Sequence, residues 1–196
     1  MSQEQHRIVN HLSTSIRLGI VVFGVFGVAY CLLVTGLAQV VWPAQASGSL
    51  LRKGGEVVGS VWVGQAFDDP RYFIGRPSAS GYDPMAMAGS NLARSNPELT
   101  HRLSQREQVL RERLGLTDTD QLPSDLLSQS GSGNDPHLSV ASAYLQVPAV
   151  ARARGVSNQD IKAIVDAHVE QPQWGILGAS RVNVLELNLA LDNTVR

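Results

Sequence analysis

Residues 18–41 read LGIVVFGVFGVAYCLLVTGLAQVV, and this stretch decides the architecture of the chain. It contains no charged residue, and Gln39 is its one strongly polar side chain. A helix rises about 1.5 Å per residue, so about 20 apolar residues cross the hydrocarbon of a bilayer. Arg17 precedes the stretch, and Trp42-Pro43 follows it with an interfacial aromatic and a residue that stops helices. We therefore expect a transmembrane helix over residues 18–41.

A cleaved signal peptide is the competing interpretation of this region. Ala44-Gln45-Ala46 resembles a cleavage site, and Arg7 with Arg17 fits a positively charged leader. The apolar stretch is longer than the roughly 7–15 residues of a signal peptide, which favours a retained anchor. Positive charges are nearly balanced on the two sides of the span, but Arg17 abuts it whereas Arg52 lies further away. This favours a cytoplasmic N-terminus.

The chain is accordingly expected to have four parts. Residues 1–17 form a cytoplasmic N-terminus, residues 18–41 the transmembrane helix, and residues 42–55 a linker. Residues 56–196 form one extracytoplasmic domain of the α+β class. The single cysteine excludes an internal disulfide, and a net charge of −1 gives no electrostatic case for nucleic-acid binding.

Small side chains gather on one face of the predicted membrane helix. At about 100° per residue, a single stripe contains Gly24, Gly27, Cys31, Thr35 and Ala38. Small residues let helix backbones approach closely in lipid, so the stripe predicts a docking face for another membrane helix. The alternative is that glycine is simply common in such helices, and no G-x-x-x-G motif occurs.

The polar domain combines strand, loop and helix signals. Residues 56–67 and 71–75 predict two strands, and residues 75–96 form a long loop rich in Gly, Ser, Asn and Pro. Asn96-Pro97 and Gly115 mark the start and end of a helix. Further helices are expected at residues 139–154, with a break at Pro148, and after the capping residue Ser157. Residues 181–192 fit either strand or helix, and we favour helix.

Candidate catalytic groups are few. Asp135-Pro136-His137 places an acid beside an imidazole and could form an acid–base pair, but an Asx turn explains the same residues. Arg76 could bind an anion or pin its loop, and we favour pinning. The five histidines form no metal-binding motif, so neither a catalytic residue nor a metal site is predicted.

Four blocks of sequence carry a family resemblance. They are GRPSA (75–79), GSNL (89–92), SGSGNDPHLS (130–139) and RVNVLELNLALD (181–192). In order and spacing these blocks, with the preceding span, resemble KdpC, the C subunit of Kdp-type potassium-transporting ATPases. The resemblance covers nearly the whole chain.

The resemblance implies a non-catalytic subunit of a potassium uptake complex in the bacterial inner membrane, with its domain on the extracytoplasmic face. It implies two partners, a potassium-channel-like subunit and an ATP-hydrolysing subunit. The family is described as a catalytic chaperone that raises ATP affinity, with ATP contacts attributed to a glutamine that corresponds to Gln146. ATP is cytoplasmic, so we expect the partner to bind it and any effect to be indirect, worth about 1–3 kcal/mol.

Docking to the channel-like subunit is expected to use the loops at residues 75–96 and 130–139 and the small-residue helix face. The candidate partner-binding residues are Gly24, Gly27, Cys31, Thr35, Arg76, Ser90, Asn91, Asp135 and His137. Two alternatives stay open: an anchored hydrolase that uses Asp135 and His137, and a stand-alone anchored binding module.

Overall fold

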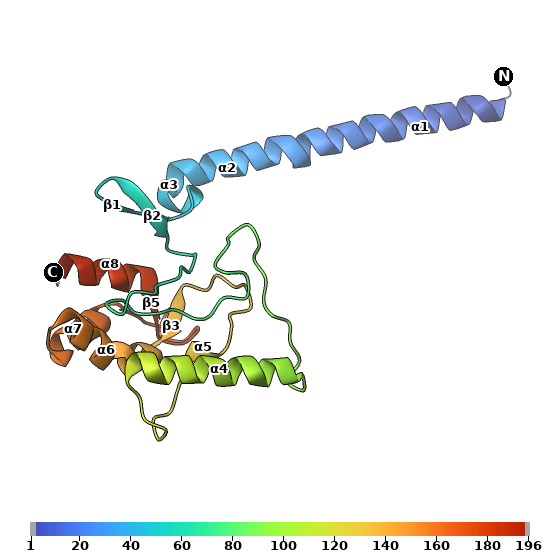
Figure 1. The fold of residues 1–196 in the computed structure, drawn as a ribbon. Helices are drawn as coiled ribbons and strands as arrows, with labels where there is room; N and C mark the ends of the chain where they lie inside the picture. Colours follow the sequence, from blue (N-terminus) through green and yellow to red (C-terminus); the bar gives the residue numbers. More distant parts are fainter. Residues whose placement is uncertain (1–2, 195–196) are drawn as a thin grey trace. The chain divides into compact units, whose positions relative to one another are not determined.

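The computed structural model describes residues 3–194, and the chain divides into two units, Met1–Ser49 and Leu50–Arg196. Figure 1 shows a long N-terminal helix in the first unit and a mixed helix-and-strand domain in the second. This confirms the predicted α+β class with one apolar N-terminal helix. Residues 1–2 of the predicted N-terminal part and residues 195–196 of the predicted domain lie outside the described residues.

The first unit is helical almost throughout. It contains α1 (Gln3–Val22), the π-helix η1 (Phe23–Ala29), α2 (Tyr30–Val41) and the short α3 (Pro43–Ala46). The continuous stretch Asn10–Val41 has a mean hydropathy of 2.4 in its most apolar window, none of which is buried, and by length and composition it can cross a membrane. One such helix indicates membrane anchoring. The helix breaks at Trp42, as the following proline predicts.

The second unit begins earlier than expected. Strand β1 (Leu50–Lys53) pairs antiparallel with β2 (Glu56–Ser60), so the predicted linker at residues 42–55 contains a strand and the short helix α3. Gly54 and Gly55 both have positive φ angles and form the tight turn of this hairpin. The sequence interpretation took these glycines as linker composition and missed their role as a turn.

The strand predicted at residues 56–67 is confirmed in its first part only, and the strand predicted at residues 71–75 is wrong. The strand expected at residues 56–67 ends at Ser60, and residues 71–75 form no strand. A second sheet has the order β3-β5-β4, with β3 (His137–Ser139), β4 (Val169–Glu170) and β5 (Arg181–Asn183) all antiparallel.

The predicted helices are largely confirmed. Helix α4 (Pro97–Leu114) starts at the cap Asn96, whose side chain accepts from the Glu98 N–H, and ends at Gly115 in the left-handed conformation. Helix α7 (Asn158–Ala167) is capped by Ser157. The ambiguous tail contains both structures, since β5 leads directly into α8 (Val184–Thr194). A short helix, α5, spans Ser124–Leu127.

Helix α6 (Val140–Arg154) runs through Pro148 without the expected break. Ala149, Val150 and Ala151, directly after the proline, are buried, and this packing offsets the cost of the missing N–H. Helix α6 contacts both α4 and α7, and these helices enclose the core with α8 and the second sheet (Figure 1). The fully buried apolar side chains include Phe73, Leu110, Leu126, Ile161, Val165, Val182, Leu187 and Leu191.

Candidate functional site

Two loops that are far apart in sequence are held together in the domain. The second loop, expected over residues 130–139, ends at Pro136 because His137–Ser139 form β3. We call residues 75–96 and 130–136 the loop pair. The Ser130 N–H donates to the Pro77 carbonyl at 3.2 Å, and Asn134 Nδ2 donates to the Asp83 carbonyl at 3.1 Å. The structure therefore brings together the two loops that the sequence singled out separately.

Glycines allow the two loops to approach closely. A Cβ atom on Gly89 would lie 2.8 Å from the Gly131 carbonyl oxygen. Gly133 has a φ of +77°, and a Cβ atom there would lie 2.7 Å from the Ala88 carbonyl oxygen. A side chain at either position would push the loops apart, so these glycines are required by the contact itself.

A partly buried ion pair joins the two loops. Arg76 Nη1 lies 3.0 Å from Asp135 Oδ2, and Arg76 Nη2 donates to the Gln129 carbonyl at 3.3 Å. The His137 backbone N–H donates to Asp135 Oδ1 at 3.0 Å, and His137 Nδ1 lies 3.4 Å from that oxygen. Burial raises the pKa of Asp135, but the His137 and Arg76 bonds outweigh it and hold the pKa at about 2. Asp135 is thus an ionised hub.

His137 does not have the surroundings of a catalytic imidazole. Its Nε2 atom is buried, has no hydrogen-bond partner and lies 3.9 Å from Glu170 Oε1. Glu170 is itself paired with Arg181 at 2.8 Å. The His137 ring thus lies between the carboxylates of Asp135 and Glu170, and the centroid of the Trp62 ring is 6.3 Å from its own. The geometry supports a structural Asx turn at Asp135.

The other loop candidates shape the backbone. Asn91 has a φ of 51°, and its neighbour Ser90 lines a hollow beside α4. The tip of the first loop is folded by its own hydrogen bonds, since Met85 N–H donates to Asp83 Oδ1 at 2.8 Å. Met85 is nevertheless 92% exposed and Met87 60% exposed. The loop pair therefore presents flexible apolar side chains on an ordered backbone.

Gln146 lies in the core and is 1% exposed. Its Oε1 accepts from the Ile74 N–H at 2.8 Å, and its Nε2 donates to the carbonyls of Ile74 and Ser142, each at 3.2 Å. Asn188 binds Phe73 in the same way: its Oδ1 accepts from the Phe73 N–H and its Nδ2 donates to the Phe73 carbonyl, both at 2.9 Å. We call Gln146 and Asn188 the amide clamp. The clamp supplies the hydrogen bonds that a neighbouring strand would have supplied, which explains why residues 71–75 form no strand.

The membrane helix modifies the predicted small-residue stripe. In η1 the N–H groups bond five residues back, so the angle per residue differs from the 100° of an α-helix. Gly24 has open space around it, but the Phe23 ring lies against Gly27, 3.1 Å from where its Cβ would be. The Cys31 thiol donates to the Phe26 carbonyl at 3.8 Å. The stripe of Gly24, Gly27, Cys31 and Thr35 is therefore interrupted at Gly27.

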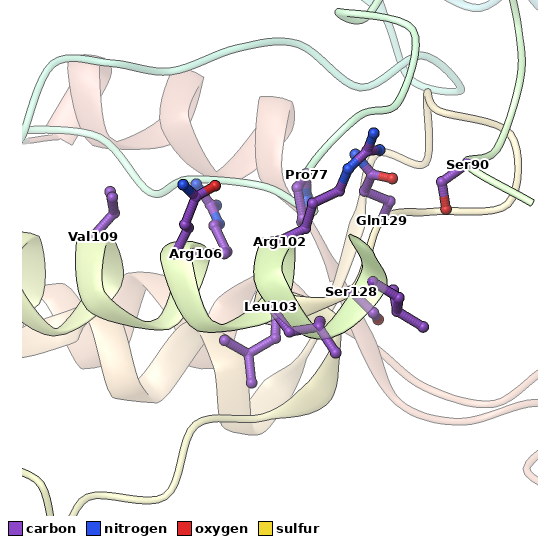
Figure 2. Close-up of a pocket in the computed structure, with 11 residues that line it drawn as sticks. Pro77, Ser90, Arg102, Leu103, Arg106, Val109, Ser128 and Gln129 are labelled. Atoms are coloured by element: carbon purple, nitrogen blue, oxygen red, sulfur yellow. The ribbon is translucent and has the colours of Figure 1, made fainter. Parts of the chain in front are cut away.

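Two exposed features were missed by the sequence interpretation. The turn at residues 171–180 has no charged residue and exposes Trp174 by 80% and Ile176 by 79%. Its signal was the uncharged run QPQWGILGAS. The second feature is a hollow of about 350 Å³ between α4 and the loops that carry Pro77, Ser90 and Gln129 (Figure 2). Among the described residues, no group of three His, Cys, Asp or Glu side chains could hold a metal.

Comparison with known proteins identifies the family. The family described as "KdpC: K+-transporting ATPase, c chain" matches residues 12–193. A potassium-transporting ATPase KdpC subunit of Xanthomonas campestris pv. campestris (strain B100) is 53% identical over 166 residues, which are 85% of this chain and 79% of the relative. The corresponding subunit of Shewanella putrefaciens is 45% identical over 186 residues, 95% of this chain and 93% of the relative. The subunit of Sorangium cellulosum is 49% identical over 185 residues, 93% and 97% of the two chains. The chain therefore belongs to the KdpC family and is a non-catalytic subunit of the Kdp potassium-transporting ATPase complex.

Proposed function

We propose that the chain stabilises the Kdp complex from the extracytoplasmic side of the bacterial inner membrane, with its N-terminus in the cytoplasm. The loop pair docks on the potassium-channel-like subunit, and the open parts of the helix stripe pack against a membrane helix. The observation that carries this proposal is the loop tip, where Met85 and Met87 stand exposed on an ordered backbone. Exposed methionines suit a surface that adapts to a partner.

The test of docking is co-purification of the complex in detergent. The double substitution Met85→Asp and Met87→Asp should reduce recovery of the chain with its partners by about tenfold, because it places charge in an apolar contact. Val57→Asp in strand β2 is the matched control, since Val57 is also apolar and 49% exposed. Equal recovery of the two variants would overturn docking through the loop tip.

Orientation has its own test. Asp118→Cys, in a Cys31→Ala background, should react with a membrane-impermeant maleimide added to intact spheroplasts, because Asp118 is exposed and lies outside the proposed docking surface. A cysteine placed at exposed Ser15 should react only after the membrane is opened. The reverse labelling would place the domain in the cytoplasm.

We further propose that the chain raises the ATP affinity of the hydrolysing subunit indirectly, through assembly. In support, Gln146 is buried and both of its amide protons bond to backbone carbonyls, so the side chain has no donor to offer a nucleotide. An azido-ATP photoprobe applied to the intact complex should label the hydrolysing subunit and leave this chain unlabelled, while removal of the chain raises the KM for ATP. Labelling of the peptide around Gln146 would contradict the indirect route.

A further inference from the structure

Helix α4 places two arginines, one turn apart, along the hollow shown in Figure 2. Arg102 pairs with Glu98 at 2.7 Å. Arg106 donates its Nε–H to the Leu126 carbonyl at 3.1 Å and has no carboxylate within 4 Å among the described residues. Burial lowers the pKa of Arg106, as expected for a cation that is removed from water without a counter-charge.

The remaining walls of this hollow are mostly apolar, and no acidic residue lines it. The apolar residues are Pro77, Leu99, Leu103, Val109 and Leu127, and the polar ones besides the arginines are Ser90, Gln105, Ser128 and Gln129. A cationic group set among apolar walls is complementary to an anionic group attached to apolar ones. The hollow therefore suits a binding group that carries both a negative charge and an apolar part.

Arg106 also forms a wall of a second, neighbouring hollow of about 250 Å³. Arg113 lies there, two turns along the same face of α4, and donates to the Phe67 and Asp69 carbonyls at 3.0 and 3.2 Å. Arg113 likewise has no carboxylate within 4 Å in the described part of the chain, although Asp68 lines the same hollow and compensates some of its charge. Arg106, between the hollows, is therefore the less compensated cation.

We propose that the hollow beside α4 receives a short segment of a partner subunit in which an Asp or Glu side chain lies next to an apolar one. The carboxylate pairs with Arg106, and the apolar side chain packs against Leu103 and Val109. The volume of about 350 Å³ suits a few side chains and is small for the two acyl chains of a phospholipid. Pro77 and Ser90 belong to the loop pair, so the hollow continues the surface that we propose to dock. This inference rests on the proposed function.

The test uses the intact complex with the photo-crosslinking residue p-benzoylphenylalanine at Val109, which is 54% exposed on the rim of the hollow. Irradiation should join the chain to one partner subunit at a peptide that contains Asp or Glu. Adding Arg106→Glu should lower the yield of this adduct by about tenfold or more, because like charges then face each other in a partly desolvated site. Arg106→Lys should keep most of it.

The matched control is Arg111→Gln, since Arg111 is on the same helix, has its own partner Glu107 at 2.7 Å and does not line the hollow. Its adduct yield should equal that of the parent. The thermal unfolding midpoint of each variant shows whether a lost adduct reflects lost folding, and Arg106→Lys with a normal midpoint and no adduct would overturn the proposal. So would an intact complex whose crosslinks reach only lipid, or an unchanged yield in Arg106→Glu. Failure of the parent chain to co-purify at all would instead overturn the proposed function.

Discussion

The amide clamp and the loop pair both hold irregular backbone in place, but they use different means. In the clamp, Gln146 and Asn188 bond to both the N–H and the carbonyl of one residue each, entirely inside the core. In the loop pair, close glycine contacts and the Arg76–Asp135 ion pair act at a partly exposed surface.

The two devices therefore serve different ends: the amide clamp stabilises the core, whereas the loop pair keeps side chains available to a partner. A buried amide that satisfies backbone groups cannot leave its place without stranding them, so the clamp suits a fixed core. In the loop pair the hydrogen bonds hold the backbone, and the exposed side chains of Met85 and Met87 can contact a partner. The family attribution of ATP contacts to a glutamine at the position of Gln146 points to the clamp, whereas the exposed surface lies on the loops.

The largest effect should come from Gln146→Leu. The substitution strands the Ile74 N–H and carbonyl in the core, and at about 1–3 kcal/mol for each unsatisfied group the free energy of unfolding should fall by about 4 kcal/mol. Urea unfolding of the purified chain measures this. Gln159→Leu, on the exposed side of α7, is the control and should change stability little. A stable Gln146→Leu chain with a selective loss of the ATP effect would show that the clamp is functional.

The next largest effect should come from Gly133→Ala. Ala at a φ of +77° is strained, and its Cβ would meet the Ala88 carbonyl, so we expect a loss of about 2–3 kcal/mol confined to the loops. Gly81→Ala is the matched control, because Gly81 also has a positive φ, +64°, but open space around it. Hydrogen exchange should quicken in the loop pair of the first variant only. Equal exchange in both would mean that the close approach contributes nothing.

Features that depend on neighbouring residues could be predicted from the sequence, whereas features that depend on distant residues could not. The caps Asn96 and Ser157 and the stop at Gly115 act within one turn, and all three were predicted. The bonds that replace a strand at Phe73 and Ile74 come from residues 115 and 72 positions away, so the local pattern of these residues resembled a strand. Long-range partners of this kind leave no periodic signal.

The candidate site shows the same limit. The turn at Asp135 was legible because an Asp two residues before an N–H donor is a local motif. Its pairing with Arg76 was not, because 59 residues separate the two. The π-helix η1 was also missed, since its run of Val, Phe and Gly is equally compatible with an α-helix.

A smaller effect, which depends on pH, is expected from Asp135→Asn. The folded pKa of Asp135 is about 2 against an ordinary value of 3.8, so the ionised carboxylate stabilises the fold above about pH 4, and this is lost as the pH falls through 2. Near neutral pH the variant should be less stable by on the order of 2 kcal/mol. Urea unfolding from pH 7 to pH 2 should show the two proteins converging in acid. If the difference in unfolding free energy between the two proteins stayed constant with pH, the stabilising role of the ionised Asp135 carboxylate would be contradicted. The exposed control Asp118→Asn should have the stability of the parent at each pH.

The smallest effect should come from Arg181→Gln, on the other side of His137. Arg181 and Glu170 are directly opposite on β5 and β4, 2.8 Å apart, but their side chains are 49% and 36% exposed. Exposed ion pairs contribute about 0–1 kcal/mol and are screened by salt, so we expect a loss of about 0.5 kcal/mol that disappears in 1 M salt. Arg76→Gln should cost more and keep most of its cost in salt, because the Arg76–Asp135 pair is less exposed. If the two substitutions cost the same at both salt concentrations, burial does not distinguish the ion pair of the loops from that of the sheet. That result would contradict the view that the Arg76–Asp135 ion pair makes the loop pair a rigid docking surface.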